Sequence, residues 1–157
     1  MNIIKTTLTL LLIVFSLSSC GAKSKDVKEG NGVKTYAISL TKEEFIKKVV
    51  DYKANPEEWL FIADKPVIID FWAEWCIYCR RLAPVLEELA QEYEGEIYVY
   101  KVNTEEEREV AAAFGIRSLP TLLFISLKED PQVIQGAIPK KDLKKIIDEL
   151  LLKKIKK

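Results

Sequence analysis

The sequence predicts an α/β domain with a central mixed five-stranded β-sheet and helices on both faces. The run Val67–Trp72 is nearly all apolar, which is typical of a central strand covered on both sides. The first predicted strands alternate with segments of helical periodicity, which favours parallel pairing. A short polar turn at 128–131 separates the last two predicted strands and favours an antiparallel hairpin. The expected order of elements is β-α-β-α-β-α-β-β-α.

The first predicted strand covers residues 36–40, and a helix follows it. Glu44 lies three residues after Thr41, which is the spacing of a capping box and predicts the start of this helix. One face of the helix is apolar and would carry Phe45, Ile46, Val49 and Val50.

A loop at 53–65, broken at Asn55-Pro56, connects this helix to the central strand. It contains an apolar cluster of Trp59, Leu60, Phe61 and Ile62. We expect Trp59, Phe61 and Ile62 to pack against the sheet edge or the first helix rather than to form a partner site.

The central strand Val67–Trp72 contains one acid, Asp70, and leads into a helix predicted over 76–93. Apolar residues recur in that segment with helical spacing. Pro84 lies inside it, so we expect a kink there.

The second half of the domain repeats the alternation of strands and helices. A buried strand is predicted at 97–102, and a second capping box, Thr104 to Glu107, predicts a helix through Phe114. Short strands follow at 122–126 and Gln132–Gln135. The last element, 139–155, is a lysine-rich amphipathic helix with an inward face of Leu143, Ile146, Ile147, Leu150 and Leu151.

Composition excludes several classes of function. A length of 157 residues fits one domain. Lysine plus arginine equal aspartate plus glutamate at 24 each, which argues against a nucleic-acid binder. Without histidine there is no Ser-His-Asp or Cys-His catalysis and no histidine-ligated metal. The predicted domain has two cysteines, and an all-cysteine zinc site needs four, so we expect no metal.

The N-terminus has the layout of a secretory signal at 1–19. Its apolar run, 8–17, is shorter than the ~20 residues that span a bilayer. The run ends in Leu17-Ser18-Ser19-Cys20, which resembles the lipobox of bacterial lipoproteins and implies lipidation of Cys20. The alternative is a plain signal peptide with an incidental cysteine. Residues 20–34 predict a flexible tether, which leaves 35–157 as the folded domain.

The chemistry is predicted at Cys76-Ile77-Tyr78-Cys79. Two thiols at this spacing can close a small ring by oxidation and open it by reduction. Cys76 lies where a buried strand turns into a helix, and the N-terminal N–H groups there favour a thiolate nucleophile. Cys79, one turn later, can resolve a mixed disulfide and should be the more buried thiol. The alternative is a purely structural disulfide.

Two segments, 67–90 and 101–125, carry a family resemblance. VIIDFWAEWCIYCRRLAPVLEELA and KVNTEEEREVAAAFGIRSLPTLLFI resemble the active-site and cis-proline segments of the thioredoxin family, and the resemblance extends over 36–152. It implies the thioredoxin fold and a thiol-disulfide oxidoreductase. No cofactor is needed beyond the redox-active cysteine pair.

The resemblance also implies roles for residues around the cysteines. Asp70, a lone acid that burial should keep neutral with a raised pKa, would assist deprotonation of Cys79, with Lys101 near it. The alternative for Asp70 is an acid at the strand's edge, bonded to the backbone, and the alternative for Lys101 is a plain surface lysine. Pro120 would be cis and face the cysteines, and the backbone of Leu119 would pair with an extended substrate. Gly136 would keep the docking groove open.

The residues next to the thiols are expected to contact substrate. Trp75, Ile77 and Tyr78 would supply apolar surface around Cys76. Thioredoxins usually have Gly-Pro between the cysteines, whereas oxidases and isomerases usually have a histidine there. The absence of that histidine predicts a redox potential in the reducing half of the range from about −270 to about −120 mV. The adjacent arginines, 80 and 81, are either a solvated helix face or a partner-selecting pair.

Together these features predict a monomeric, lipid-anchored reductase of protein disulfides in the bacterial cell envelope. A membrane thiol-transferring reductase would supply its electrons, and no nucleic acid would be bound. The first alternative is an oxidase or isomerase of the same fold. The second is a binding or chaperone module with the same fold.

Overall fold

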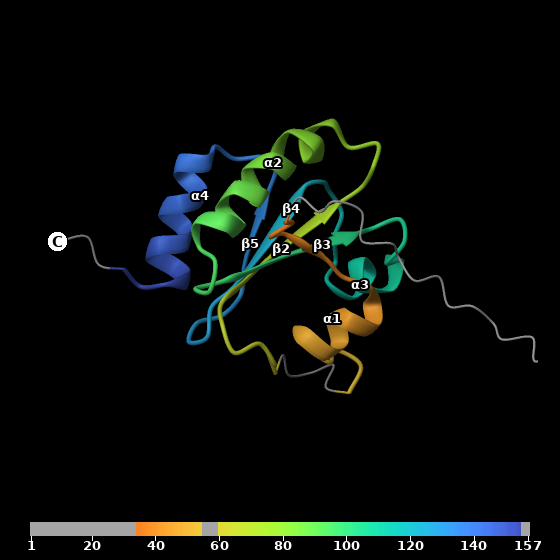
Figure 1. Cartoon of the computed structure of the whole chain (residues 1–157). Helices are drawn as coiled ribbons and strands as arrows, with labels where there is room; N and C mark the ends of the chain where they lie inside the picture. Colours follow the sequence, from red (N-terminus) through yellow and green to blue (C-terminus); the bar gives the residue numbers. More distant parts are fainter. Residues whose placement is uncertain (1–33, 55–59, 155–157) are drawn as a thin grey trace, which may run out of the picture. The chain divides into compact units, whose positions relative to one another are not determined.

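A computed structural model describes residues 34–54 and 60–154 (Figure 1). The elements are β1 (Ile38–Ser39), α1 (Lys42–Lys48), β2 (Val67–Trp72), α2 (Ile77–Glu92), β3 (Tyr98–Asn103), α3 (Arg108–Ala113), β4 (Thr121–Ile125), β5 (Gln132–Gln135), α4 (Lys140–Ile146) and the π-helical segment η1 (Ile147–Leu151). The predicted signal, Cys20, the tether up to 33, and Trp59 lie outside the described residues. Within the described ranges, no helix has the length and apolar character needed to cross a membrane.

The five strands form one mixed sheet in the order β1-β3-β2-β4-β5. β1, β3 and β2 run parallel, whereas β4 is antiparallel to β2, and β5 is antiparallel to β4. The predicted mixed sheet and terminal hairpin are therefore confirmed. In the register, Asp70 of β2 lies between Lys101 of β3 and Leu122 of β4.

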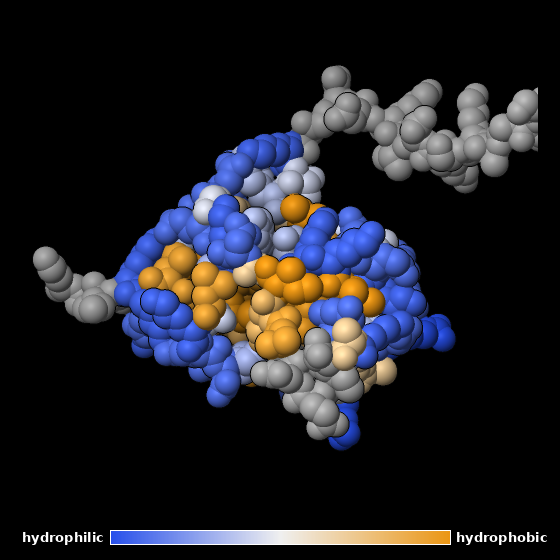
Figure 2. Space-filling view, turned by 90° about the horizontal axis from the view of Figure 1, so that it is seen from below, coloured by the Kyte–Doolittle hydropathy of each residue, from blue (hydrophilic) through white to orange (hydrophobic). Residues whose placement is uncertain are grey.

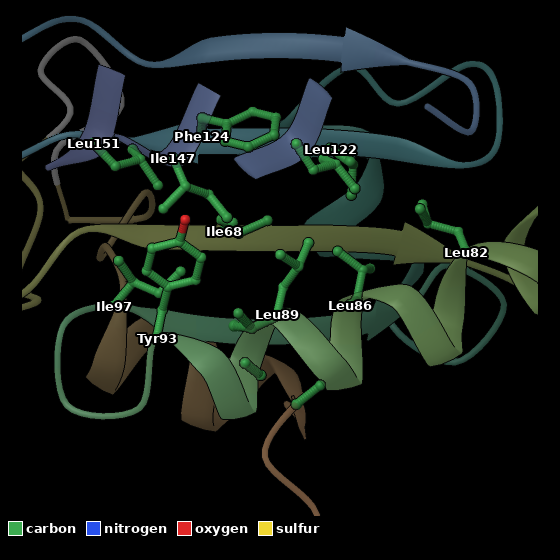
Figure 3. Close-up of a cluster of buried hydrophobic side chains, with 14 residues drawn as sticks. Ile68, Leu82, Leu86, Leu89, Tyr93, Ile97, Leu122, Phe124, Ile147 and Leu151 are labelled. Atoms are coloured by element: carbon green, nitrogen blue, oxygen red, sulfur yellow. The ribbon is translucent and has the colours of Figure 1, made fainter. Parts of the chain in front are cut away.

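Alternation along β2 divides the core into two layers. Val67, Ile69 and Phe71 join an apolar cluster with Phe45 of α1 and Val110 of α3. Ile68 points the other way, into a cluster with α2, α4 and η1. Figure 3 shows side chains of these elements converging on β2: Leu82, Leu86, Leu89, Ile147 and Leu151. By the same alternation, Asp70 lies on the sheet face that α2 covers.

The two predicted capping boxes have different outcomes. At Thr41 the box is present: the Glu44 N–H donates to Thr41 Oγ1 (3.3 Å), and the Thr41 N–H donates to Glu44 Oε2 (3.1 Å). The box at Thr104 is wrong, because α3 begins at Arg108 and its N-cap, Glu107, makes no side-chain cap. Thr104 Oγ1 instead donates to the carbonyl of Trp72 (3.2 Å). The local pattern predicted that this hydroxyl would cap a helix, but it bonds the last residue of β2 instead.

Several other boundaries also differ from the sequence prediction. The first strand is only Ile38–Ser39, whereas β3 and β4 are displaced by one residue. The last helix changes to π-helical geometry at Ile147 and ends at Leu151, rather than continuing to 155. α2 continues through Pro84 without ending.

The long loop before β2 packs in part as predicted. Phe61 forms an isolated antiparallel bridge with Val50 and packs against the cluster around α1. Ile62 is 55% exposed, so the packing prediction holds for it only in part.

Hydrophobic side chains also reach the surface of the domain. Figure 2, seen from below Figure 1, shows hydrophobic residues gathered across the middle of that side between hydrophilic flanks. A pocket of about 270 Å³ opens on the α1/α3 face of the sheet and is lined by Phe71, Phe114, Ile116, Leu123, Pro131 and Val133.

Candidate active site

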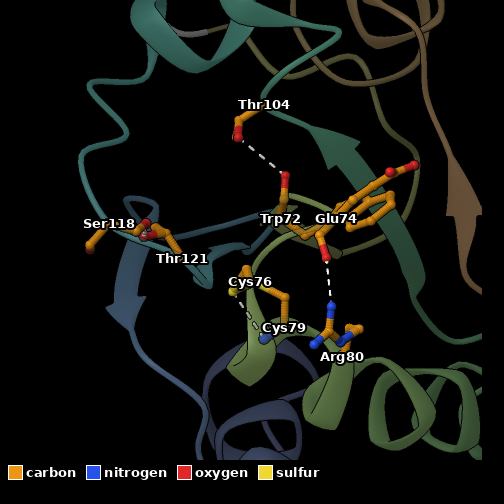
Figure 4. Close-up of a disulfide and its surroundings, with 8 residues drawn as sticks. All are labelled: Trp72, Glu74, Cys76, Cys79, Arg80, Thr104, Ser118 and Thr121. Carbon is orange, nitrogen blue, oxygen red and sulfur yellow. Dashed lines mark hydrogen bonds between the residues drawn. A yellow bond between two sulfur atoms is a disulfide. The ribbon is translucent and has the colours of Figure 1, made fainter.

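Cys76 and Cys79 form a disulfide at the start of α2 (Figure 4). Cys76 is the N-cap of the helix, and its Sγ accepts a hydrogen bond from the Cys79 N–H (3.1 Å). Such a donor stabilises negative charge on Cys76 Sγ after reduction, which is the property that the sequence predicts for a nucleophile. Cys79 is 2% exposed and Cys76 4% exposed, a difference too small to separate the two thiols by burial.

Asp70 is buried beneath this helix. It is 1% exposed, and neither carboxylate oxygen has a hydrogen-bond partner among the described residues. Burial raises its pKa to about 7, against a smaller lowering by the charge of Lys101. The predicted burial and raised pKa of Asp70 are confirmed, and the alternative of an edge acid bonded to backbone does not fit its unbonded oxygens. A carboxyl with this pKa can take and give a proton at neutral pH.

Lys101 lies directly opposite Asp70 in the parallel pairing of β2 and β3. Its Nζ is 5.1 Å from the centroid of the Trp72 ring, which holds the ammonium over an aromatic face. The predicted proximity of Lys101 to Asp70 is confirmed.

The loop before β4 faces the disulfide. The Leu119–Pro120 bond is cis, as predicted. Thr121 Oγ1 donates to the Ser118 carbonyl (2.7 Å) and closes this turn. Figure 4 shows Ser118 and Thr121 on one side of the cysteines, with Glu74 and Arg80 on the other.

Gly136 continues the β4–β5 pairing at the same end of the sheet. Its N–H donates to the Pro120 carbonyl (2.8 Å), and its φ is +88°, where a side chain is strained. A Cβ placed there would meet no atom within 4 Å. The space in front of Gly136 is therefore open, which agrees with the expected docking groove.

An apolar rim surrounds the disulfide. Trp75, Ile77 and Tyr78, which lie on either side of Cys76 in the sequence, are 66%, 55% and 60% exposed. The guanidinium of Arg81 lies 5.7 Å from the centroid of the Tyr78 ring, and Arg80 Nη1 donates to the Glu74 carbonyl (3.0 Å). The arrangement suits an apolar segment placed over the disulfide.

A groove of about 380 Å³ adjoins the rim. Trp75 and Leu119 line it together with Thr104, Arg108, Ala111, Ala112, Ile116, Arg117 and Ser118. Local sequence patterns do not assign Thr104, Arg108 or Arg117 to this surface, because the end of β3, the helix α3 and the cis-proline loop meet only in the folded chain. One signal in the sequence pointed there: the four arginines all lie between positions 80 and 117.

Comparison with known proteins decides the family. A sequence model of the family described as Thioredoxin matches residues 36–149. The chain belongs to the thioredoxin family. It is therefore a thioredoxin-fold thiol-disulfide oxidoreductase that acts on disulfide-bonded substrates.

Individual thioredoxins cover most of the domain. The chain is 46% identical over 113 residues to thioredoxin of Borreliella burgdorferi, covering 72% of this chain and 96% of that protein. It is 41% identical over 115 residues to thioredoxin 1 of Nostoc sp. (73% and 97%). A third relative, the M-type chloroplastic thioredoxin of Spinacia oleracea, is 43% identical over 109 residues (69% and 60%). The roles of the individual site residues stay predictions, for which the geometry above supplies the physical basis.

Proposed function

We propose that this thioredoxin-family protein is a lipid-anchored reductase of protein disulfides in the bacterial cell envelope. The observation that carries the reductase proposal is the joint placement of an N-capping Cys76, an open cis-proline groove and the buried Asp70. Each of these meets a separate requirement of thiol-disulfide exchange: a stabilised thiolate, a docked disulfide and a proton acceptor.

In the proposed reaction, the Cys76 thiolate attacks one sulfur of the substrate disulfide. A bond forms between Cys76 and that sulfur, while the other substrate sulfur leaves as a thiolate and takes up a proton. Cys79 then loses its proton to Asp70 and attacks Cys76 Sγ, which releases the second substrate thiolate. Two electrons pass to the substrate, and the protein is left with the Cys76–Cys79 disulfide.

The sequence supports the location and the electron donor. The segment 1–19 and Cys20 have the layout of a lipoprotein signal. Outside the cytosol NADPH is not at hand, so another protein must reduce the Cys76–Cys79 disulfide. A membrane thiol-transferring reductase fits this need, because its dithiol can exchange with the disulfide directly.

Insulin reduction by dithiothreitol tests the reductase proposal, using the full chain in detergent. We expect the wild-type protein to accelerate the reaction and Cys76→Ser to abolish the acceleration. Cys20→Ala is the matched control, since it removes a cysteine without touching the redox pair. Acceleration by Cys76→Ser would refute the assigned nucleophile. If wild type is inactive too, the binding or chaperone alternative is favoured. Equilibration with glutathione measures the redox potential and separates a reductase from an oxidase, which would show a potential of about −120 mV.

Fractionation of cells tests the anchor. We expect the wild-type chain in the membrane pellet, with the added mass of a diacylglyceryl group on Cys20. Cys20→Ala should be found outside the pellet, because the lipid that binds the membrane is no longer attached. Retention of Cys20→Ala in the pellet would show that lipidation does not hold the protein there.

A further inference from the structure

The four arginines of this chain all lie around the active site. Arg80 and Arg81 directly follow Cys79 in α2. Arg108 and Arg117 line the groove that Trp75 and Leu119 share. The twenty lysines, by contrast, are spread from the N-terminus to the C-terminus.

The arginines also differ from the lysines in their partners. Every ion pair found among the described residues uses a lysine, such as Lys144 with Glu92 or Lys42 with Glu109. All four arginines are exposed, and none of them pairs with a carboxylate in the described part of the chain. Arg108 Nε donates only to the backbone carbonyl of Glu105 (3.1 Å). The outer guanidinium nitrogens of Arg108 and Arg117 are therefore free to bind a ligand.

The groove limits which ligand fits. A substrate segment paired with the backbone of Leu119 would pass beside Arg108 and Arg117, next to the cysteine under attack. Guanidinium groups bind carboxylates in a planar, two-bond geometry that lysine cannot match. The exposed acids Glu74, Glu105 and Glu106 are close in sequence to Trp75 and Thr104, which line the groove, and they oppose a broadly acidic partner. The charges therefore favour one or two carboxylates at the groove rather than an acidic surface.

We propose that Arg108 and Arg117 bind a carboxylate next to the reacting cysteine, so that this thioredoxin prefers substrate disulfides flanked by aspartate or glutamate. The proposal rests on the proposed disulfide reduction and adds the substrate class. Each exposed arginine–carboxylate pair contributes modestly, and two together correspond to a preference of about fivefold.

Single-turnover kinetics with the reduced full-length protein tests this proposal. The substrates are two disulfide peptides that differ only in the residues beside one cysteine, glutamate in one and lysine in the other. Both rates are divided by the rate with neutral hydroxyethyl disulfide. We expect wild type to reduce the glutamate peptide about fivefold faster at low salt, with the preference shrinking as salt rises. Arg108→Gln with Arg117→Gln should bring the ratio near one, whereas the matched control, Lys47→Gln with Lys141→Gln, should keep it.

The other outcomes contradict the proposal in distinct ways. Equal rates for both peptides in wild type, with hydroxyethyl disulfide reduced, would overturn the acid preference and leave the reductase function intact. A preference that persists in the double arginine variant would remove Arg108 and Arg117 from it. Failure to reduce any of the three substrates would overturn the proposed function and this inference together. Arginine-dependent binding to vesicles of anionic lipid, combined with equal peptide rates, would reassign the arginines to a membrane contact.

Discussion

The two faces of the central sheet are built from alternate residues of the same strands, yet they differ in chemistry. On the α1/α3 face, Phe45 is fully buried, with its ring centroid 5.1 Å from that of Phe114 and 6.3 Å from that of Tyr52. On the α2/α4 face, the otherwise apolar layer contains Asp70, whose carboxylate is buried without a hydrogen bond to any described residue. Among the described residues the first face has no buried acid, whereas the other contains an acid whose ionisation is opposed.

The difference shows that one face of the sheet contributes to stability alone, whereas the other contributes to stability and to the chemistry of the cysteines. Aromatic packing stabilises the α1/α3 face, and the described members of its cluster include neither Cys76 nor Cys79. On the α2/α4 face, a buried carboxyl opposes folding at neutral pH and also supplies a proton acceptor under the helix of the cysteines. The comparison predicts that substitutions on the first face change stability alone, whereas substitutions near Asp70 change stability and pH dependence together.

The largest change in stability is expected from Phe45→Ala on the α1/α3 face. Removing a fully buried aromatic ring should lower the free energy of unfolding by about 3–5 kcal/mol. Urea unfolding measures the loss, and Lys47→Ala, exposed on the same helix, should stay within about 0.5 kcal/mol of wild type. The redox potential of the folded variant should equal that of wild type. A shifted potential would show that the two faces are coupled.

The outcome at Phe45 was predictable from sequence, whereas the groove was not. Phe45 follows a capping box and shares a helical face with Val49, so its burial is encoded within a few residues. The burial of Asp70 was equally predictable, because a single acid within a strand of apolar residues is buried together with its neighbours. The roles of Thr104 and Arg108 depend on their neighbours after folding: the Trp72 carbonyl for Thr104 and the groove for Arg108. Local patterns cannot contain that information, and at Thr104 the pattern predicted a helix cap that a strand end replaced.

The second prediction concerns Asp70→Asn. The pKa of Asp70 rises from 3.8 to about 7 on folding, so between about pH 4 and pH 7 the folded protein keeps a proton that the unfolded chain has lost. This group therefore makes wild type less stable as pH rises through that window, by at most about 4 kcal/mol above it. Asparagine does not titrate, so the variant should gain stability relative to wild type from pH 4 to pH 8.

Urea unfolding of the oxidised proteins across this range measures that gain. The pH dependence is the test, because any cost of burying the asparagine amide is the same at every pH. A stability difference that does not change with pH would mean that Asp70 is already ionised in the folded protein at pH 4. Insulin reduction by Asp70→Asn should slow as well, and slow most near pH 7, where the carboxyl exchanges protons.

The smallest effect is expected from Lys101→Met, which alters the charge beside Asp70 and leaves the acid in place. Lys101 lies opposite Asp70 in the register and lowers its pKa. Removing the ammonium should raise the pKa of Asp70 further. The free energy of unfolding should then keep falling to a higher pH than in wild type, because the folded protein keeps its proton to a higher pH while the unfolded chain does not.

The ¹³C chemical shift of the Asp70 carboxyl measures the midpoint of its titration directly. Lys47→Met is the control, since it removes the same charge on the α1/α3 side of the sheet. A midpoint that moves equally in both variants would trace the effect to net charge, and one that stays fixed in Lys101→Met would show that solvent screens this pair. A shift confined to Lys101→Met would instead assign the tuning of the buried acid to the strand beside it, on the one sheet face where chemistry and stability are coupled.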